Sequence, residues 1–359
     1  MKLAVISFTE RGSRQNRKVV EWLKNHGWEC EGYAQEKFLD GTEGLLPLKE
    51  TLQNWTERQF LNCQGLIFVG ACGIAVRAVA PWVRDKMTDP AVLVCDEAGD
   101  FVIPLLSGHV GGANQLAKEL GKAVGAVPVI TTATDVNGVF AVDLFASGNG
   151  CILSDRKLAK EISAALLQGK QVLISSDFPL EGKIPEGLKV VSKDKLSEEG
   201  GKVLGIWITW SEEEMPGILK LIPEGIALGI GCRKGILPET VKEQAERVLG
   251  KARIDRRALC CLTSIDLKQE EEGICQLAQE WRLPFITFGA EELDHVPGSF
   301  SSSEFVQQVT GVDCVCERSA AAYFHEKGIP WEMLERKQAA HQVTTALAGK
   351  KIIIHMEWT

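Results

Sequence analysis

The sequence predicts an α/β protein with an N-terminal α/β domain, a small middle α/β region and a separate C-terminal α/β domain. Three observations lead to this fold class. Strand and helix signals alternate over residues 1–136, which indicates a sheet covered by helices. The signals weaken over residues 137–222. A new apolar strand signal then opens residues 223–359, which indicates a second core.

The N-terminal domain begins with an apolar segment that predicts a strand, and helical spacing of apolar residues follows it. Residues 96–100 separate two apolar runs and predict a hairpin turn. The expected strands are 2–8, 66–69, 91–95, 101–106 and 127–131, and the expected helices are 13–25, 74–80 and 115–123.

The middle region predicts a helix at 155–167, with Ser154 as its N-cap, and strands at 171–175 and 203–210. Residues 179–202 predict loops or a hairpin, and residues 211–225, with three consecutive glutamates and two prolines, predict a linker. In the C-terminal domain Pro238 suits the first turn of a helix, and residues 301–304 form a capping box. The expected C-terminal strands are 226–230, 258–263 and 285–288. The expected helices are one from residue 239, one at 269–281 and one that the capping box opens and that runs to residue 309.

Charge and composition disfavour nucleic acid and membranes as partners of this protein. The chain of 359 residues has a net charge of −8, which disfavours nucleic acid as a partner because phosphate binding needs a basic surface. No apolar stretch is long enough to cross a bilayer, and the first apolar run is too short for a signal peptide. We therefore expect a cytoplasmic protein without a membrane partner. Its eleven cysteines show no C-x-x-C spacing, so we expect reduced thiols and no protein-bound metal.

The most informative segment is Leu106–Asn114, Leu-Ser-Gly-His-Val-Gly-Gly-Ala-Asn, between an expected strand and an expected helix. Free backbone N–H groups and the helix dipole at such a position favour a bound anion. His109 is the one side chain in this segment that titrates near neutral pH. The alternative is that the glycines only allow tight packing of the helix on the strand.

Two more polar loops follow expected strands in this domain, at residues 70–77 and 131–135. The carboxyl ends of parallel strands meet at one crevice, so parallel strands would bring the three loops together. Asp135 has a competing role as the cap of the next turn. The side chains expected to line this single pocket are Arg77, His109, Asn114, Thr131, Thr132 and Asp135.

The sequence disfavours several other common binding and catalytic sites. Gly70-x-x-Gly73 lacks the spacing of a dinucleotide fingerprint, and no Walker A, H-E-x-x-H or G-x-S-x-G motif occurs. Asp96 and Glu97 are more typical of a solvated turn than of an acid–base pair.

In the C-terminal domain residues 229–235 repeat the strand-to-glycine-turn pattern with two cations. Arg233 can bind a carboxylate through two hydrogen bonds, and Lys234 adds a point charge. Cys232 lies beside these cations, but a packing thiol is favoured over a nucleophile because no histidine is near it in sequence.

Together these motifs resemble the cobalt-precorrin-5A hydrolase family (CbiG) of oxygen-independent cobalamin biosynthesis. The resemblance spans most of the chain and includes the long block around Gly-His-Val-Gly-Gly-Ala-Asn, whereas residues 314–318 and 331–336 depart from it. The family's N-terminal domain, middle region and C-terminal domain agree with the expected boundaries. The segments that carry the resemblance are 70–77, 105–120, 128–135, 143–146, 229–235, 264–268 and 311–322.

The resemblance implies a hydrolase that opens the ring-A lactone of cobalt-precorrin-5A and releases acetaldehyde to give cobalt-precorrin-5B. Cobalt arrives with the substrate, so no cofactor and no metal ligands are expected. We expect His109 to act as general base, with His109 or Asp135 deprotonating the freed hydroxyl. Backbone N–H groups at Gly111 and Gly112 would stabilise the oxyanion. The other expected substrate contacts are Gly73, Arg77, Gly108, Asn114, Thr131, Thr132, Arg233 and Lys234.

Two alternatives remain open. A corrinoid-binding or delivery protein would hold this intermediate without breaking it down, and a nucleotide-dependent oxidoreductase would bind a nicotinamide cofactor. Acetaldehyde release separates the hydrolase from the first alternative. Other enzymes of the cobalamin pathway are expected as partners beyond the substrate. The sequence leaves strand order and oligomeric state open, with a homodimer among the options.

Overall fold

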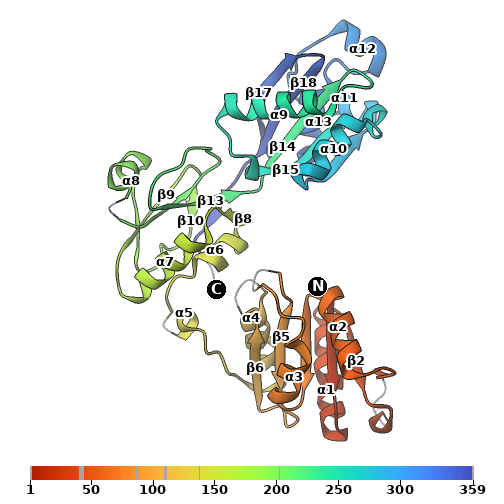
Figure 1. Ribbon diagram of the computed structural model, residues 1–359, viewed down its shortest axis with the longest axis vertical. Helices are drawn as coiled ribbons and strands as arrows, with labels where there is room; N and C mark the ends of the chain where they lie inside the picture. The colour runs from red at the N-terminus through yellow and green to blue at the C-terminus, as the bar shows by residue number, and fades with distance from the viewer. Residues whose placement is uncertain are drawn as a thin grey trace. The chain divides into compact units, whose positions relative to one another are not determined.

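The computed structural model describes residues 2–39, 44–85, 88–108, 111–136, 138–201 and 203–357 (Figure 1). The chain divides into two compact units, residues 1–144 and residues 145–358. Both units combine sheets with helices, which confirms the expected α/β fold class. Within the described residues, none of the helices has both the length and the apolar character that crossing a membrane requires.

The first unit contains a seven-stranded sheet in the order β3-β2-β1-β4-β5-β6-β7. Strands β1 to β5 run parallel, β6 runs antiparallel to β5, and β7 runs parallel to β6. The expected β5–β6 hairpin is confirmed, and Asp96 accepts hydrogen bonds from Ala98 N (3.0 Å) and Phe101 N (2.7 Å) in its turn. The strands are β1 (Lys2–Ser7), β2 (Glu29–Ala34), β3 (Leu45–Pro47), β4 (Gly65–Val69), β5 (Ala91–Cys95), β6 (Phe101–Leu106) and β7 (Val127–Pro128).

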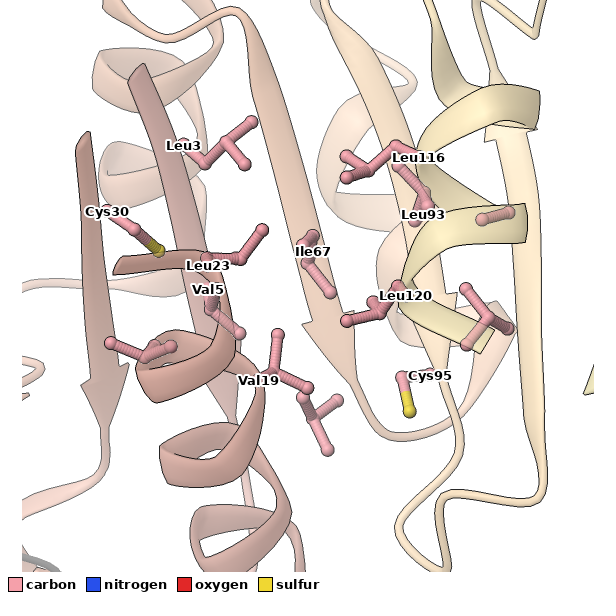
Figure 2. Close-up of a cluster of buried hydrophobic side chains, with 14 of the residues drawn as sticks. Leu3, Val5, Val19, Leu23, Cys30, Ile67, Leu93, Cys95, Leu116 and Leu120 are labelled. Atoms are coloured by element: carbon pink, nitrogen blue, oxygen red, sulfur yellow. The ribbon is translucent and has the colours of Figure 1, made fainter. Parts of the chain in front are cut away.

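Helices cover both faces of this sheet. Helices α1 (Glu10–Asn25) and α4 (Ala113–Val124) pack on one face, where Leu23 and Leu120 meet apolar residues of the central strands (Figure 2). Helices α2 (Leu52–Asn62) and α3 (Cys72–Val79) pack on the other. Each fully buried aliphatic side chain contributes about 1.5–3 kcal/mol. The remaining elements of this unit are η1 (Glu36–Phe38) and α5 (Ala133–Val136), and α6 (Val142–Gly148) begins in this unit and ends in the second.

The second unit begins with a five-stranded sheet in the order β11-β9-β12-β13-β8, in which β8 alone runs antiparallel to its neighbour. The expected N-cap at Ser154 is wrong, because the carboxylate of Asp155 accepts from Lys157 N and Leu158 N and caps the helix. The expected loops or hairpin at 179–202 are also wrong. This stretch contains a helix and two strands, and the two strands pair with β19 (Ile354–His355) and β9 rather than with each other. The elements are β8 (Cys151–Leu153), α7 (Arg156–Leu167), β9 (Val172–Ser176), β10 (Leu180–Glu181), β11 (Leu188–Val190), α8 (Lys193–Glu199) and β12 (Gly205–Ile208).

The expected linker at 211–225 is wrong as well. It contains β13 (Ile218–Pro223), which lies between β12 and β8 and is buried along its whole length. The glutamates and prolines around it obscure this apolar run in the sequence. Burial of the run between two strands decides the structure, since sheet formation follows packing more than local composition.

The C-terminal part of this unit contains a second five-stranded sheet, in the order β16-β15-β14-β18-β17. Strands β14 to β16 are parallel, and β18 runs antiparallel to both β14 and β17. Helices α9 and α10 cover one face and α13 the other. The elements are β14 (Ile226–Cys232), α9 (Pro238–Ala252), η2 (Arg256–Ala258), β15 (Leu259–Ile265), η3 (Asp266–Lys268), α10 (Glu272–Trp281), β16 (Phe285–Phe288), α11 (Ala290–Asp294), α12 (Glu304–Thr310), α13 (Val315–His325), β17 (Trp331–Ala340) and β18 (Val343–Lys350).

The end of the chain returns to the middle region. Strand β19 (Ile354–His355) pairs in parallel with β10, and Asn149 exchanges hydrogen bonds with the backbone of His355 at 2.8 and 3.0 Å. The expected division at residues 136 and 222 stays a prediction.

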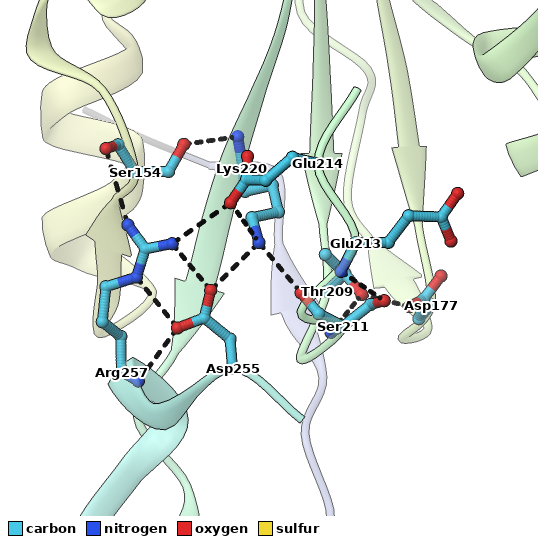
Figure 3. A network of polar contacts seen from close by, with 9 residues as sticks. All are labelled: Ser154, Asp177, Thr209, Ser211, Glu213, Glu214, Lys220, Asp255 and Arg257. Carbon is cyan, nitrogen blue, oxygen red and sulfur yellow. Dashed lines mark hydrogen bonds and ion pairs between the residues drawn. The ribbon is translucent and has the colours of Figure 1, made fainter. Parts of the chain in front are cut away.

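A buried lysine joins the middle sheet to the segment that precedes β15 (Figure 3). The side chain of Lys220, on β13, is 1% exposed. Its Nζ donates to Asp255 Oδ2 and to the Ser211 carbonyl, both at 3.0 Å, and lies 2.8 Å from Glu214 Oε1. Arg257 donates to both oxygens of Asp255, at 2.9 and 2.6 Å. The buried ammonium is thus fully paired, which its burial requires.

We predict that Lys220→Met lowers the free energy of unfolding by about 2 kcal/mol, because it leaves Asp255 and the Ser211 carbonyl short of a donor. Urea denaturation followed by circular dichroism measures this. The control is Lys157→Met, which removes an exposed pair with Glu161 at 4.0 Å and should change stability by less than about 0.5 kcal/mol. Equal effects of the two substitutions would contradict the prediction.

The same network predicts a pH dependence. Burial alone would raise the pKa of Asp255, but hydrogen bonds from Arg257 and Lys220 outweigh it and lower the pKa to about 2. A lowered pKa in the folded state adds stability that is complete above about pH 4 and is lost as the pH falls towards 2. We expect Asp255→Asn to cost about 2 kcal/mol at pH 7 and progressively less below pH 4 in urea titrations. A cost that stays constant down to pH 3 would exclude this linkage.

Candidate functional site

The loop between β6 and α4, here called the glycine-rich loop, lies at the edge of the sheet where β4 and β5 begin. Its described residues are Ser107, Gly108, Gly111 and Gly112. Leu106 pairs with Val92, and Ser107 Oγ donates to the carbonyl of Asp89 at 2.9 Å. Because β7 runs parallel to β6, the segment after β7 lies at this same edge. There Asn114 Nδ2 donates to Thr132 Oγ1 at 3.1 Å. The structure therefore brings together the expected residues Gly108, Gly111, Gly112, Asn114, Thr131 and Thr132.

Gly73 and Arg77 lie at the opposite edge. They follow β4, whose carboxyl end points away from that of β6, because β6 is antiparallel to β5. Arg77 Nη1 donates to the Gly73 carbonyl at 3.0 Å, which keeps the guanidinium at the first turn of α3. The expectation that these two residues share a crevice with the glycine-rich loop is wrong. The cause is the reversal of β6 at the hairpin turn of residues 96–100. The sequence predicts this hairpin, which is incompatible with parallel strands that would bring all three loops to one edge.

The N-terminus of α4 is less open to an anion than the sequence suggested. Ala113 N donates to the Ser107 carbonyl (3.1 Å) and Asn114 N to the Gly108 carbonyl (2.9 Å), so two amides of the first turn are already bonded. Gly112 is the N-cap with φ +80°, a conformation that favours glycine. A Cβ on Gly108 or Gly111 would lie 2.7 Å from Asn114 Oδ1 or 2.4 Å from Ser107 Cβ. Tight packing therefore explains these two glycines.

The two residues expected to be catalytic cannot be placed in this geometry. His109 lies outside the described residues, and Asp135 is described only as part of the backbone of α5. Their roles stay predictions.

The second unit contains a cavity of about 770 Å³ at the carboxyl ends of β14 and β15. Arg233 and Lys234, at the end of β14, line it as the sequence suggested. The turn between β17 and β18 forms part of the wall, with His341 at φ +47° and Gln342 at φ +66°. Gln342 Oε1 accepts a hydrogen bond from Arg233 Nη1 at 3.4 Å. Cavities of roughly this size hold small organic ligands, typically at the carboxyl ends of strands.

Sequence reasoning missed several residues of this cavity. Lys268 ends η3 after β15, and Lys337 comes from β17. Phe305, on α12, is 70% exposed and adds an apolar wall. The resemblance covered Lys268 without assigning it a role, and strand β17, which carries Lys337, was not expected at all. Further apolar residues that line the cavity are Ile265, Leu267, Val306, Val309 and Val315.

The cavity is positively charged although the chain as a whole is acidic. Four Lys or Arg side chains line it, and among the residues that the structure describes no Asp or Glu does. Lys268 Nζ pairs with Glu271 Oε2 at 2.8 Å, behind the cavity wall. Lys234 and Lys337 form no ion pair with any described residue. An excess of cations in a concave site attracts anionic ligands and binds their carboxylates.

The side chain of Glu271 accepts a hydrogen bond from the turn after β14, which carries Arg233 and Lys234. Its side chain is 6% exposed, and Oε1 accepts from Gly235 N at 2.7 Å. Burial alone would raise the pKa of Glu271, but hydrogen bonds from Lys268 and from the backbone of Gly235 outweigh it and lower the pKa. The ionised carboxylate therefore fixes both Lys268 and the turn that carries Lys234.

Cys232 also lines the cavity. Burial raises the pKa of its thiol to about 11, in spite of the nearby Lys268. The thiol is therefore protonated at neutral pH, which favours the packing role over a nucleophilic one. In the described part of the chain, no three His, Cys, Asp or Glu residues lie together as a metal site would require.

The geometry is suited to a large ligand that has an apolar body and several carboxylates. The apolar wall can cover a ring system, while the cations at the strand ends can bind carboxylates around its rim.

Comparisons with known proteins identify the family. Residues 54–135 match the family model described as Cobalamin synthesis G N-terminal, residues 140–223 the Cobalamin biosynthesis central region, and residues 226–348 the Cobalamin synthesis G C-terminus. The chain is 38% identical over 289 residues to a cobalt-precorrin-5A hydrolase from Salmonella typhimurium, covering 79% of this chain and 82% of that protein. It is 28% identical over 362 residues to a cobalt-precorrin-5A hydrolase from Priestia megaterium, covering 96% and 94%.

Among solved structures, a cobalamin biosynthesis protein G homologue from Sulfolobus solfataricus is 22% identical, with a TM-score of 0.41 over 98% of this chain and 97% of that one. The three family models and the two curated relatives together cover the chain from the first unit to the last sheet. The chain belongs to the cobalt-precorrin-5A hydrolase family of cobalamin biosynthesis.

Proposed function

We propose that this protein hydrolyses cobalt-precorrin-5A, opens the ring-A lactone and releases acetaldehyde to give cobalt-precorrin-5B. The observation that carries the proposal is the cavity of about 770 Å³ that is lined by four cations and an apolar wall. Such a substrate is an apolar macrocycle with acetate and propionate groups around its rim. Arg233 and Lys234 would bind these carboxylates, and Phe305 would pack against the ring.

The glycine-rich loop of the first unit would supply the chemistry. His109 would take a proton from the attacking water, and the N–H groups of Gly111 and Gly112 would bind the oxyanion that forms on the lactone carbonyl. His109 or Asp135 would then deprotonate the freed hydroxyl. The carbon–carbon bond to the macrocycle breaks, its electron pair passes to the conjugated ring, and the two-carbon fragment leaves as acetaldehyde.

The substrate brings its cobalt, and no further cofactor is part of the proposal. Location in the cytoplasm, association with other enzymes of the pathway and a homodimeric state remain proposals from the sequence.

We expect His109→Ala to lower kcat by roughly 10²–10⁴-fold, because the attacking water loses its general base. Acetaldehyde release from cobalt-precorrin-5A, coupled to alcohol dehydrogenase and NADH oxidation, measures the rate. His26→Ala is the matched control, since His26 is an exposed residue at the end of α1 and should leave kcat unchanged. A His109→Ala variant with the wild-type rate would remove the proposed base. Substrate binding by the wild type without acetaldehyde would instead favour the delivery protein.

Charge removal in the cavity tests the binding site separately. We expect Arg233→Gln and Lys234→Gln each to raise the KM for cobalt-precorrin-5A by about tenfold, or about 1.4 kcal/mol, because each loses a charge-assisted contact to a carboxylate. Their kcat should stay within about twofold, since these residues bind the rim of the ring. Arg247→Gln is the control, because Arg247 is an exposed cation on α9 that does not line the cavity. An unchanged KM in both cavity variants would exclude this site.

A further inference from the structure

We infer that Lys337 binds a carboxylate of the macrocycle and that the buried Glu317 is the positioning residue that directs Lys337 into the cavity. The inference rests on the proposed function, because it deepens the substrate site described above. Neither residue is among the expected substrate contacts. Glu317 lies in residues 314–318 and Lys337 directly follows residues 331–336, the two stretches that depart from the family pattern. The contacts of Glu317 with two separate parts of the chain, Ser301 and residues 336–337, support the assignment.

Glu317 lies on the first turns of α13, and its side chain is 0% exposed. Oε1 accepts hydrogen bonds from Ser301 Oγ and Lys337 N, both at 2.8 Å. Oε2 accepts from Ser301 N at 2.8 Å and from Arg336 Nη1 at 3.4 Å. A buried carboxylate with four donors is well paired, whereas an uncompensated one would be costly. The position of the carboxylate therefore depends on these donors, and the carboxylate in turn holds the donors in place.

The backbone N–H of Lys337 can donate to Glu317 because β17 contains a bulge. Glu335 pairs with Leu347 and Gln338 with Thr345, so two residues of β17, Arg336 and Lys337, face a single residue of β18. The extra residue leaves the regular ladder, and the Lys337 N–H donates to Glu317 instead of to β18. Bulges commonly redirect a side chain beside a functional site. Here the bulge places the Lys337 side chain in the cavity wall.

Glu317 also holds the start of the segment that leads to the apolar wall on α12. Ser301 lies two residues before Ser303, the N-cap of α12, whose side chain accepts from Val306 N at 3.5 Å. The segment from Ser301 to α12 thus begins at the carboxylate and ends with the apolar residues that line the cavity. One buried carboxylate therefore holds the bulge that carries Lys337 and the start of the helix that carries Phe305.

The charge of Glu317 matters as much as its position. Burial alone would raise the pKa of Glu317, but hydrogen bonds from Lys337 N and Ser301 outweigh it and lower the pKa. The ionised carboxylate can accept from all four donors. A glutamine at this place would turn its NH₂ group towards either Lys337 N or Ser301 N, so either the bulge or the segment that leads to α12 would lose its anchor.

A double-mutant cycle on the full-length protein tests the inference. The probe is uroporphyrin III, a tetrapyrrole with eight carboxylates, and its Kd is measured by the change in its absorption spectrum. We expect Lys337→Gln and Glu317→Gln each to weaken binding by about tenfold. The double variant should also be weaker by about tenfold rather than about a hundredfold, because a misdirected Lys337 has no contact left to lose. Glu332→Gln, on the same strand before the bulges, is the control and should bind as the wild type does.

Independent effects that multiply to about a hundredfold would overturn the positioning role, and an unchanged Kd in Lys337→Gln would overturn the binding role. If thermal melts show that Glu317→Gln does not fold, Glu317→Asp replaces it in the cycle, because it keeps the charge but is one methylene too short to reach Lys337 N. In the acetaldehyde assay the variants should raise KM and leave kcat within about twofold. Coupled binding effects in a protein that releases no acetaldehyde would support this inference while rejecting the proposed reaction.

Discussion

Strand direction is the constraint on which both candidate regions depend. In the first unit the reversal of β6 against β5 sends the glycine-rich loop to one edge of the sheet and the turn with Arg77 to the other. In the second unit the reversal of β18 against β14 has the opposite effect. It places the His341–Gln342 turn beside the carboxyl ends of β14 and β15, where the cations lie. In the first unit the antiparallel strand β6 separates Arg77 from the glycine-rich loop. In the second unit the antiparallel strand β18 adds a turn to the wall of the cavity.

Buried carboxylates then determine where the cations of the cavity point. Glu271 accepts from the turn after β14 and pairs with Lys268. Glu317 accepts from the bulge that carries Lys337. Neither carboxylate lines the cavity. Glu271 offsets the charge of Lys268, whereas Lys234 and Lys337 form no ion pair with any described residue. An acidic protein can in this way present a cationic site, because its negative charge is used for structure at positions that the ligand does not reach.

Local patterns predict the strands and their following turns well, because a strand end and a glycine turn are encoded within a few residues. They located Arg233 and Lys234 at a strand end that does line a cavity. They failed where the outcome depends on distant pairing. Burial between neighbours turned an expected linker into β13. The separation of Arg77 from the glycine-rich loop is a different case, because the predicted hairpin at residues 96–100 already implies the reversal of β6. Lys337 could not be found, because a bulge stabilised by a carboxylate twenty residues away directs it.

The distribution of the cations over separate segments has a consequence for selectivity. A single exposed lysine binds one carboxylate weakly, since water competes for both groups. Cations held at fixed positions after β14, after β15 and on β17 can engage several carboxylates of one rigid ring at once, so each later contact forms at a high effective concentration. A small monocarboxylate gains none of this advantage. The spacing of the cations therefore selects for a ring with many carboxylates, and the buried groups that maintain this spacing contribute to selectivity without touching the ligand.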